Sequence, residues 1–300
     1  MKYFEHLSFL RNIKGIGLAK INKKYIDLIP SYSDIEAFIE HVMEEETVSE
    51  YDIEAALRKS REDFDLLERD DRLSVVTCFD KEYPARFSLL ANQRPVYFYI
   101  KGDKEILKDD TIAVIGTRKP SIYGISANKK LVRQLNDVVI VSGLALGTDR
   151  IAHETAIEAG TKTIAILPSG LHSITPASNK GLADTISEGN GCIISEYSPN
   201  EVAAQYTYVR RDALVAALSD GILVIECGVK SGTMHTVESA IKMNKPIYCY
   251  YTDRGGDYSG NKKLIDEKKA GTLSKPEDIR KLVDLIRNKQ LSLLGNLEEK

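Results

Sequence analysis

The chain has 300 residues, of which 43% are hydrophobic, and its 41 lysines and arginines against 44 aspartates and glutamates give a formal net charge of −3. This composition supports one large or two smaller domains with hydrophobic cores, and the near balance of charge argues against a generally basic nucleic-acid binder. Residues 1–110 carry 17 basic against 23 acidic side chains and residues 111–300 carry 24 against 21, so the second part is the more basic.

The first 70 residues are predicted to form a small helical domain, because apolar residues recur at helical spacing over 3–12, 18–29, 33–45 and 50–69. Between the first two helices, Gly15 and Gly17 flank an isoleucine as in the hairpin of a helix-hairpin-helix module. Backbone N–H groups of such a hairpin can hold a DNA phosphate. A tight turn between two helices is the alternative interpretation.

Two strands, at 73–79 and 96–101, are predicted to bridge this helical domain to a region of regular alternation that begins at residue 111. Such alternation predicts a Rossmann-like, doubly wound α/β fold with a mostly parallel sheet and helices on both faces. Strands are expected near 111–115, 138–142, 162–167, 191–195, 221–226 and 246–251. Helices are expected near 124–136, 148–159, 178–188, 209–218 and 233–243.

After this region the sequence contains a glycine-rich loop at 254–260 and a short helical tail, in which Ile279, Leu282, Leu285 and Ile286 form one apolar stripe. We therefore divide the chain into a helical domain at 1–70, an extended Rossmann-like domain at 71–275 and a helical tail at 276–300.

The spacing of the cysteines and the length of the apolar runs indicate the cellular compartment of the protein. The four cysteines are widely separated and include no CxxC pair, so no metal site, cofactor or disulfide framework is predicted. The N-terminus lacks the apolar core of a signal peptide, and no apolar run reaches the length of about 18 residues typical of a membrane span. We expect a cytoplasmic protein that does not enter a membrane.

Glycine and phosphate-binding side chains follow the ends of the predicted strands, which in a doubly wound sheet meet at one edge. Glycines there allow the backbone to approach a phosphate, and helix N-termini favour negative charge. We predict a phosphate-binding site made of Gly116, Arg118, Lys119, Ser142, Gly143, Gly147, Ser169, Gly170, Lys230, Ser231, Gly232 and Thr233.

Three acidic residues near these strand ends are assigned supporting roles. Asp149 begins a predicted helix, where a capping role is at least as good an interpretation as a ligand role. Glu196 and Glu226 follow strands and could form a general-base pair, but we favour a role in holding arginines of the same site, such as Arg118 and Arg211. Of the five histidines, only His235 is expected to face the site.

The pattern excludes two common nucleotide sites. The segment from Gly116 lacks G-x-G-x-x-G, and no acidic residue ends the second strand to bind a ribose, so NAD-dependent redox chemistry is excluded. The sequence G-x-x-x-x-G-K-[ST] is also absent, which excludes a P-loop.

The run Tyr206-Thr-Tyr-Val-Arg-Arg-Asp212 interleaves two aromatics with two arginines directly before a predicted helix. Tyrosine stacking on bases combined with arginine contacts to phosphates is a common way to hold single-stranded nucleic acid. We therefore add Tyr208, Arg210 and Arg211 to the predicted site. A surface loop with incidental aromatics is the alternative.

The order of these motifs resembles the DNA-processing protein A family (DprA, also called Smf), and the resemblance covers roughly residues 80–280. It implies a non-catalytic, homodimeric protein that binds single-stranded DNA, loads a RecA-type recombinase, and assists recombination and DNA uptake in natural transformation. The helical N-terminus resembles the family's sterile-alpha-motif-like domain. The matching segments are Tyr83-Pro-Ala-Arg-Phe87, Pro95–Gly102, Ile115-Gly-Thr-Arg-Lys-Pro120, Ser142–Asp149, Thr163–Gly170, Ile194-Ser-Glu-Tyr197 and Ser231-Gly-Thr233.

The chain also departs from the family pattern. Leu146 stands where members usually have arginine, and Tyr208–Ala213 replaces the usual Phe-Pro-x-Arg-Asn-Arg, which places Asp212 and Ala213 at the last two positions. Each lost phosphate contact is expected to lower both DNA affinity and its salt dependence. We expect no winged helix of the family's kind in the residues after 275.

Two further functions are carried as alternatives. The sheet is similar to that of cytokinin-activating phosphoribohydrolases, whose Pro-Gly-Gly-x-Gly-Thr-x-x-Glu motif is reduced here to Gly232-Thr233, with Thr236 in place of the glutamate. Hydrolysis of nucleoside monophosphates, or nucleotide sensing without turnover, is therefore one alternative. The other is a scaffold in which Leu214, Val215 and Leu218 could pack against a second subunit, although these residues could equally belong to the core.

Overall fold

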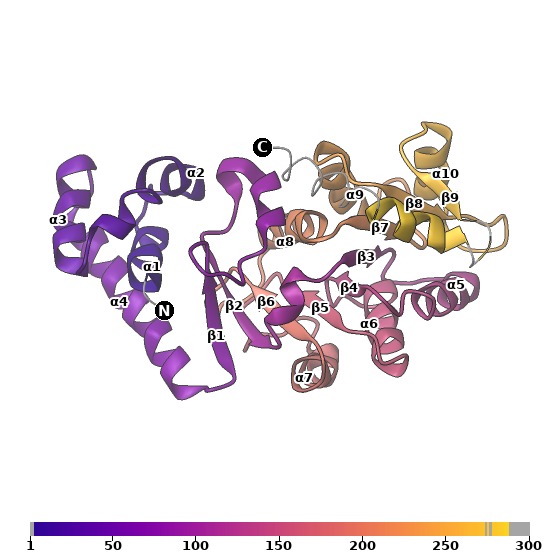
Figure 1. The fold of residues 1–300 in the computed structure, drawn as a ribbon, viewed down its shortest axis with the longest axis horizontal. Helices are drawn as coiled ribbons and strands as arrows, with labels where there is room; N and C mark the ends of the chain where they lie inside the picture. Colours follow the sequence, from indigo (N-terminus) through magenta and orange to yellow (C-terminus); the bar gives the residue numbers. More distant parts are fainter. Residues whose placement is uncertain (1–2, 274, 276–277, 288–300) are drawn as a thin grey trace.

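The computed structural model describes residues 3–273, 275 and 278–287, and its centre is a nine-stranded sheet (Figure 1). The order across the sheet is β1-β2-β6-β5-β4-β3-β7-β8-β9. The strands are β1 (Leu73–Thr77), β2 (Tyr97–Gly102), β3 (Thr111–Ile115), β4 (Val139–Ser142), β5 (Thr163–Ile166), β6 (Cys192–Ser195), β7 (Gly221–Val224), β8 (Ile247–Tyr250) and β9 (Gly271–Leu273).

From β6 to β9 the paired strands run parallel, whereas β2 pairs antiparallel with both β1 and β6. The prediction of a doubly wound, mostly parallel sheet is therefore confirmed, and all six strands expected after residue 110 are present. Two points are corrected. The segments 73–79 and 96–101 do not form a separate bridge but extend the sheet at one edge, and β9 was not predicted.

Helices cover both faces of the sheet because its central strands are apolar on both sides. One face carries α8 (Gln205–Leu218), α9 (Thr233–Lys242) and α10 (Ser259–Asp266). The other carries α5 (Ile122–Val132), α6 (Thr148–Glu158) and α7 (Lys180–Glu188). Short helical turns lie between these elements at Ala85–Gln93, Glu105–Lys108 and Ala177–Asn179.

The N-terminal helices are α1 (Phe4–Asn12), α2 (Leu18–Lys20), α3 (Ile35–Glu45) and α4 (Glu50–Arg69), and Figure 1 shows them gathered at the β1 end of the sheet. Their hydrophobic core continues into the sheet, because Phe4 packs on the rings of Tyr97 and Tyr99 in β2. The helical layer and the sheet therefore share one core. The predicted single helix at 18–29 is corrected to α2 followed by a π-helical turn at Ile21–Tyr25 and a 3₁₀ turn at Ile29–Ser31.

Two further corrections concern helix positions. The helix predicted at 209–218 begins at Gln205, so the Tyr/Arg run lies inside its first turns and not ahead of it. Residues 279–287 of the predicted tail are helical, and Ile279, Leu282, Val283 and Ile286 are buried against the sheet's α5/α6 face. Leu285, which was assigned to that stripe, is 46% exposed. Residues 276–277 and 288–300 of the predicted tail lie outside the described residues.

Candidate functional site

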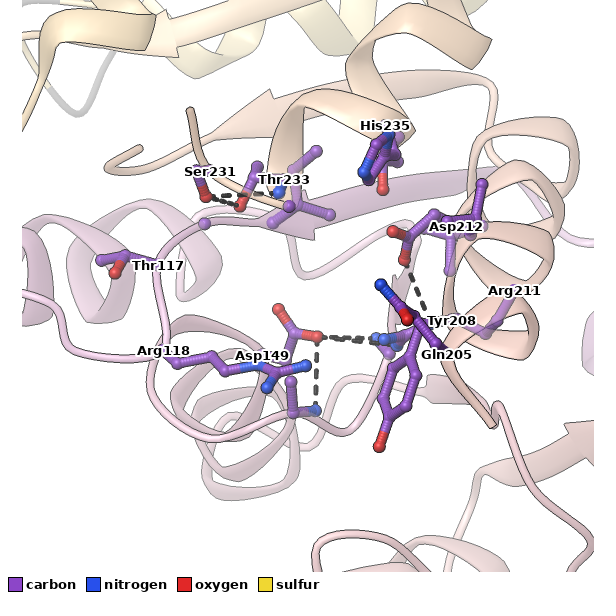
Figure 2. A pocket seen from close by; sticks show the side chains of 18 residues that line it. Thr117, Arg118, Asp149, Gln205, Tyr208, Arg211, Asp212, Ser231, Thr233 and His235 are labelled. Carbon is purple, nitrogen blue, oxygen red and sulfur yellow. Dashed lines mark hydrogen bonds and ion pairs between the residues drawn. The ribbon is translucent and has the colours of Figure 1, made fainter. Parts of the chain in front are cut away.

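A cavity of about 710 Å³ opens at the carboxyl edge of the sheet (Figure 2). It lies where strand order reverses, because β3 has β4 on one side and β7 on the other. Open α/β sheets bind ligands at such a reversal. Nine predicted residues line this cavity: Gly116, Arg118, Gly143, Asp149, Tyr208, Arg211, Ser231, Gly232 and Thr233.

Most of the predicted glycines serve close packing between protein segments. A Cβ on Gly116 would lie 2.6 Å from Thr148 Oγ1, and one on Gly143 would collide with the guanidinium of Arg211. Gly147 has a φ of +74° and packs against the backbone of Arg118. By contrast, a Cβ on Gly232 would meet no atom within 4 Å. Gly232 therefore leaves the start of α9 open to the cavity.

Arg118 is the exposed cation of the cavity. Its guanidinium lies over the ring of Tyr208, 5.6 Å from the ring centre, and it forms no ion pair with another described residue. Lys119 and Lys230 are also exposed and line a neighbouring cleft of about 440 Å³ that shares Ser231 with the cavity. The first N–H groups of α9 are bonded to Ser231 and Gly232, so the contacts open to a phosphate and a base come from the unpaired cations and the aromatic ring.

Arg211 lies deep in the cavity wall, with its side chain only 6% exposed. Its Nε is 3.1 Å from Asp212 Oδ1, and its Nη1 is 3.9 Å from Asp149 Oδ2. The backbone N–H groups of Gly143 and Ala145 donate to the same Asp149 oxygen at 3.1 and 3.3 Å. Because Arg211 lies between two carboxylates, it adds little net positive charge to the cavity.

Both of these carboxyl groups are harder to ionise than in water. Burial raises the pKa of Asp149, against the attraction of Arg211 and the backbone donors. The pKa of Asp212 is raised to about 6, chiefly by burial and also by the charge of Asp149, against the attraction of Arg211, His235 and Arg118. Above pH 6, Asp212 therefore brings a negative charge to the cavity wall.

Helix α8 divides the predicted Tyr/Arg run between two surfaces. Gln205, Tyr208, Val209 and Asp212 follow helical spacing of i, i+3, i+4 and i+7 and line the cavity. Tyr206 and Arg210, one turn apart, line a second cleft of about 420 Å³ toward the N-terminal helices. The run therefore does not present all its aromatic and cationic groups to one ligand.

The expectation that Glu196 and Glu226 hold arginines of the site is met by Glu196, although its partner is Arg210, and among the described residues no arginine pairs with Glu226. Glu196 binds Arg210 through two bonds, with Nε and Nη2 donating at 2.6 and 2.7 Å. Glu226 is 2% exposed and accepts from the backbone N–H and the hydroxyl of Ser121 at 3.0 and 2.8 Å. Both carboxylates fix loops at the edge of the site.

Three other predicted residues lie beneath the surface and outside the cavity lining. The buried hydroxyl of Ser142 donates to the carbonyl of Val114 at 2.7 Å, and that of Ser169 donates to the carbonyl of Ser173 at the same distance. Gly170 is packed against the carbonyl oxygens of residues 198 and 199. Their predicted contact with a ligand remains a prediction, and in this structure they shape the loops.

Several cavity residues were not in the predicted site. His235 was expected to face it and does, but Gln205 and Val209 gave no sequence signal because the start of α8 was placed four residues late. Thr117 follows Gly116 directly and could have been included from its position alone. Asp212 was noted only as a departure from a family pattern, yet it lines the cavity beside His235 (Figure 2).

Two features are not found within the described part of the chain. No group of three or more histidine, cysteine, aspartate or glutamate side chains is arranged to hold a metal ion there. Within that same part, none of the helices combines the length and apolar character that crossing a bilayer requires. The arrangement at the cavity offers cations, an aromatic ring and a carboxylate acceptor to a ligand.

Sequence comparison matches this chain to one family model and to several curated relatives. Residues 74–284 match the family model of DNA recombination-mediator protein A. The chain is 36% identical to the DNA processing protein DprA of Streptococcus pneumoniae over 155 residues, covering 51% of this chain and 55% of that protein. It is 28% identical to the protein Smf of Escherichia coli over 202 residues, covering 67% of this chain and 54% of that protein. The chain thus spans about half the length of these curated relatives.

Comparison of structures gives the same neighbours. The X-ray structure of DNA processing protein A from S. pneumoniae superposes with a TM-score of 0.68 at 26% identity, covering 92% of each chain. DNA processing protein A from Helicobacter pylori, whose structure concerns its single-stranded DNA binding mode, gives a TM-score of 0.65 at 31% identity and covers 71% of this chain and 96% of its own.

Proposed function

The chain belongs to the DNA recombination-mediator protein A family, and on that premise we propose that it binds single-stranded DNA at the cavity and assists DNA recombination without catalysing a reaction. The observation that carries the proposal is the exposed Arg118 guanidinium over the ring of Tyr208, at the open start of α9. A cation on an aromatic platform can bind a phosphate while the ring stacks on the adjoining base.

The roles of the three arginines in this proposal differ. Arg118 and the exposed Lys119 and Lys230 supply the phosphate contacts, because they are not paired with described acidic groups. Arg210 is held by Glu196 and Arg211 by Asp149 and Asp212, so these two position the helix and the cavity wall. This reassigns two of the predicted DNA contacts to structural roles.

From the resemblance to the family, we also propose that the chain loads a recombinase and forms a homodimer. It would act in DNA uptake and natural transformation. A RecA-type recombinase would receive the bound strand. The cysteines are all unpaired, which supports action in a reducing compartment, the cytoplasm. Light scattering of the purified chain tests the homodimer, and a monomer at micromolar concentration would contradict it.

The proposal is tested by fluorescence anisotropy with a labelled oligo-dT at low salt. Arg118→Ala is expected to weaken binding about 5- to 10-fold and to reduce the salt slope by about one, because one phosphate contact is lost. Arg133→Ala is the matched control, since Arg133 pairs with Glu158 on the surface away from the cavity. Failure of the chain to bind at micromolar concentration, or equal weakening by both variants, would reject the proposal.

A second function, nucleotide binding without a strand, is favoured by the volume of the cavity, which lies in the range of small-molecule sites. Turnover is not part of it, because Thr236 stands where the similar phosphoribohydrolases carry a glutamate. Thermal-shift measurements with nucleoside monophosphates distinguish this function, since a nucleotide that raises the melting temperature while oligo-dT does not would favour it over strand binding.

A further inference from the structure

We propose that Asp212 makes the cavity selective for guanine, by accepting hydrogen bonds from the Watson–Crick edge of the base. The inference rests on the proposed binding of nucleic acid at the cavity and adds a base preference to it. The same chemistry applies to a guanine within a strand and to a free guanine nucleotide.

The first support is the position of the carboxylate. Asp212 lines the cavity from α8 with its side chain 16% exposed. Its Oδ1 forms an ion pair with Arg211, 3.1 Å from Nε, without hydrogen-bond geometry, and neither carboxylate oxygen receives a hydrogen bond from the described residues. An ionised carboxylate is an acceptor only and can receive several donors. The group is therefore oriented by Arg211 and still has acceptor capacity facing the cavity.

The second support is the donor pattern of the four bases. Guanine presents two adjacent donors on its Watson–Crick edge, the N1–H and the N2 amino group, which match the two oxygens of a carboxylate. Adenine and cytosine present one amino group beside an acceptor nitrogen, and thymine presents one N–H between two carbonyl oxygens that a carboxylate repels. Unstacked bases of single strands are commonly read on this edge.

The third support is the separation of charges around the cavity. Figure 2 shows Asp212 and His235 together on one side, whereas Arg118 lies toward the other. The cations that can hold phosphates are Arg118, Lys119 and Lys230. A nucleotide with its phosphate at these cations can thus place its base toward Asp212, with the Tyr208 ring available for stacking.

The test compares labelled dT strands that differ at one central base. At low salt and pH 7.5, a strand with one dG is expected to bind about 10-fold more tightly than the all-dT strand, as for a bidentate base contact. Inosine in place of guanine lacks the N2 amino group and is expected to give an intermediate affinity. Competition by dGMP and by dTMP separates the free nucleotide from the strand.

Two isosteric variants with the same change of charge sharpen the test. Asp212→Asn is expected to abolish the preference for dG while keeping or strengthening the affinity for dT. Asp266→Asn is the matched control, because Asp266 lies on α10 and pairs with Lys262 away from the cavity. Melting temperatures of both variants confirm that they are folded.

Lowering the pH gives an independent readout. The charged groups that act on Asp212 are Asp149, Arg211, His235 and Arg118, and the pKa of Asp212 is about 6. At pH 5 the carboxyl group is therefore mostly protonated and loses acceptor capacity. The preference for dG over dT is therefore expected to fall between pH 7.5 and 5 in the unmodified chain. In Asp212→Asn, which has no preference to lose, the ratio is expected to stay constant.

The outcomes separate the two proposals. Equal affinity for dG, dI and dT strands would overturn guanine selection and leave strand binding intact. Binding of dGMP without binding of any strand would support the guanine site and overturn strand binding. Absence of binding by strands and by dGMP would overturn both.

Discussion

At the scale of single residues, the arginines available to bind a phosphate are those that are not paired with a carboxylate of the protein. The sequence presents Arg118, Arg210 and Arg211 as equivalent candidates, since all three lie near strand or helix ends. The structure separates them, because Glu196 and the pair Asp149/Asp212 occupy two of the three guanidinium groups. Pairings of this kind join segments far apart in sequence, and residue type alone does not predict them.

Gly143 illustrates a further residue-scale constraint. Gly143→Ala is expected to destabilise the protein by about 1–3 kcal/mol, because the new methyl group would displace the buried guanidinium of Arg211. Gly181→Ala in α7 is the control, since a Cβ there meets no atom within 4 Å. Urea denaturation of both variants measures the difference, and equal midpoints would show that Arg211 is not held as described.

At the scale of elements, the sequence predicted those with a strong local pattern. Six of the seven strands after residue 110 are continuous apolar runs that end at glycine or polar residues, and these six were predicted. The start of α8 was missed because Ala204 precedes it without a capping side chain, and the hydroxyl of Thr207 accepts from the Ala204 N–H instead. Strand β9 has only three residues, too few for a periodicity.

The pairing of β2 with β6 could not be predicted either, because its partners are about 90 residues apart and neither carries a signal for the other. The same limit applies to the site. The location of the site could be predicted from the strand ends. The division of the Tyr/Arg run between two surfaces could not, because it depends on where α8 begins.

Helix α4 is linked to the sheet through one buried carboxylate. Asp63 is 3% exposed and accepts from the Tyr99 hydroxyl at 2.7 Å and from the hydroxyl of Ser198. Tyr99→Phe is expected to cost about 1–3 kcal/mol at pH 7, because a buried acceptor loses a donor. Tyr51→Phe on the same helix is the control, since Tyr51 is 76% exposed.

The loss in Tyr99→Phe also depends on pH. Burial raises the pKa of Asp63, so the folded state favours the protonated form and stability falls as pH rises from about 4 through the folded pKa. The penalty of Tyr99→Phe should therefore shrink as the pH falls, because a larger share of the Asp63 carboxyl groups is then protonated. Chemical denaturation at pH 7 and pH 4.5 measures this, and a penalty that grows on acidification would contradict the assignment.

At the scale of the whole molecule, the helical layer and the sheet form one hydrophobic core. A single cluster of buried residues includes Phe4 and Phe38 of the helices with Tyr99, Ala165 and Ile193 of the sheet. The division into 1–70, 71–275 and 276–300 remains a prediction from sequence. The shared core leads us to expect that the first two segments unfold together.

Scanning calorimetry of Phe38→Ala tests that expectation. The substitution is expected to cost about 3–5 kcal/mol, since Phe38 is fully buried within the helical layer. If the core is cooperative, the variant lowers one transition for the whole chain. Two transitions, of which only one moves, would show that the helical layer unfolds independently. Ile122→Ala, at a 74% exposed position on α5, is the control.

The pairing of β2 with β6 has a further consequence for how the chain is made. The N-terminal helices rest on β2, and β2 is held in the sheet by residues 192–195. During synthesis from the N-terminus, we therefore expect the first hundred residues to complete their packing against the sheet only after β6 has left the ribosome. Their apolar faces stay uncovered during that interval, and we expect the nascent chain to depend on chaperones until about two thirds of it has been translated.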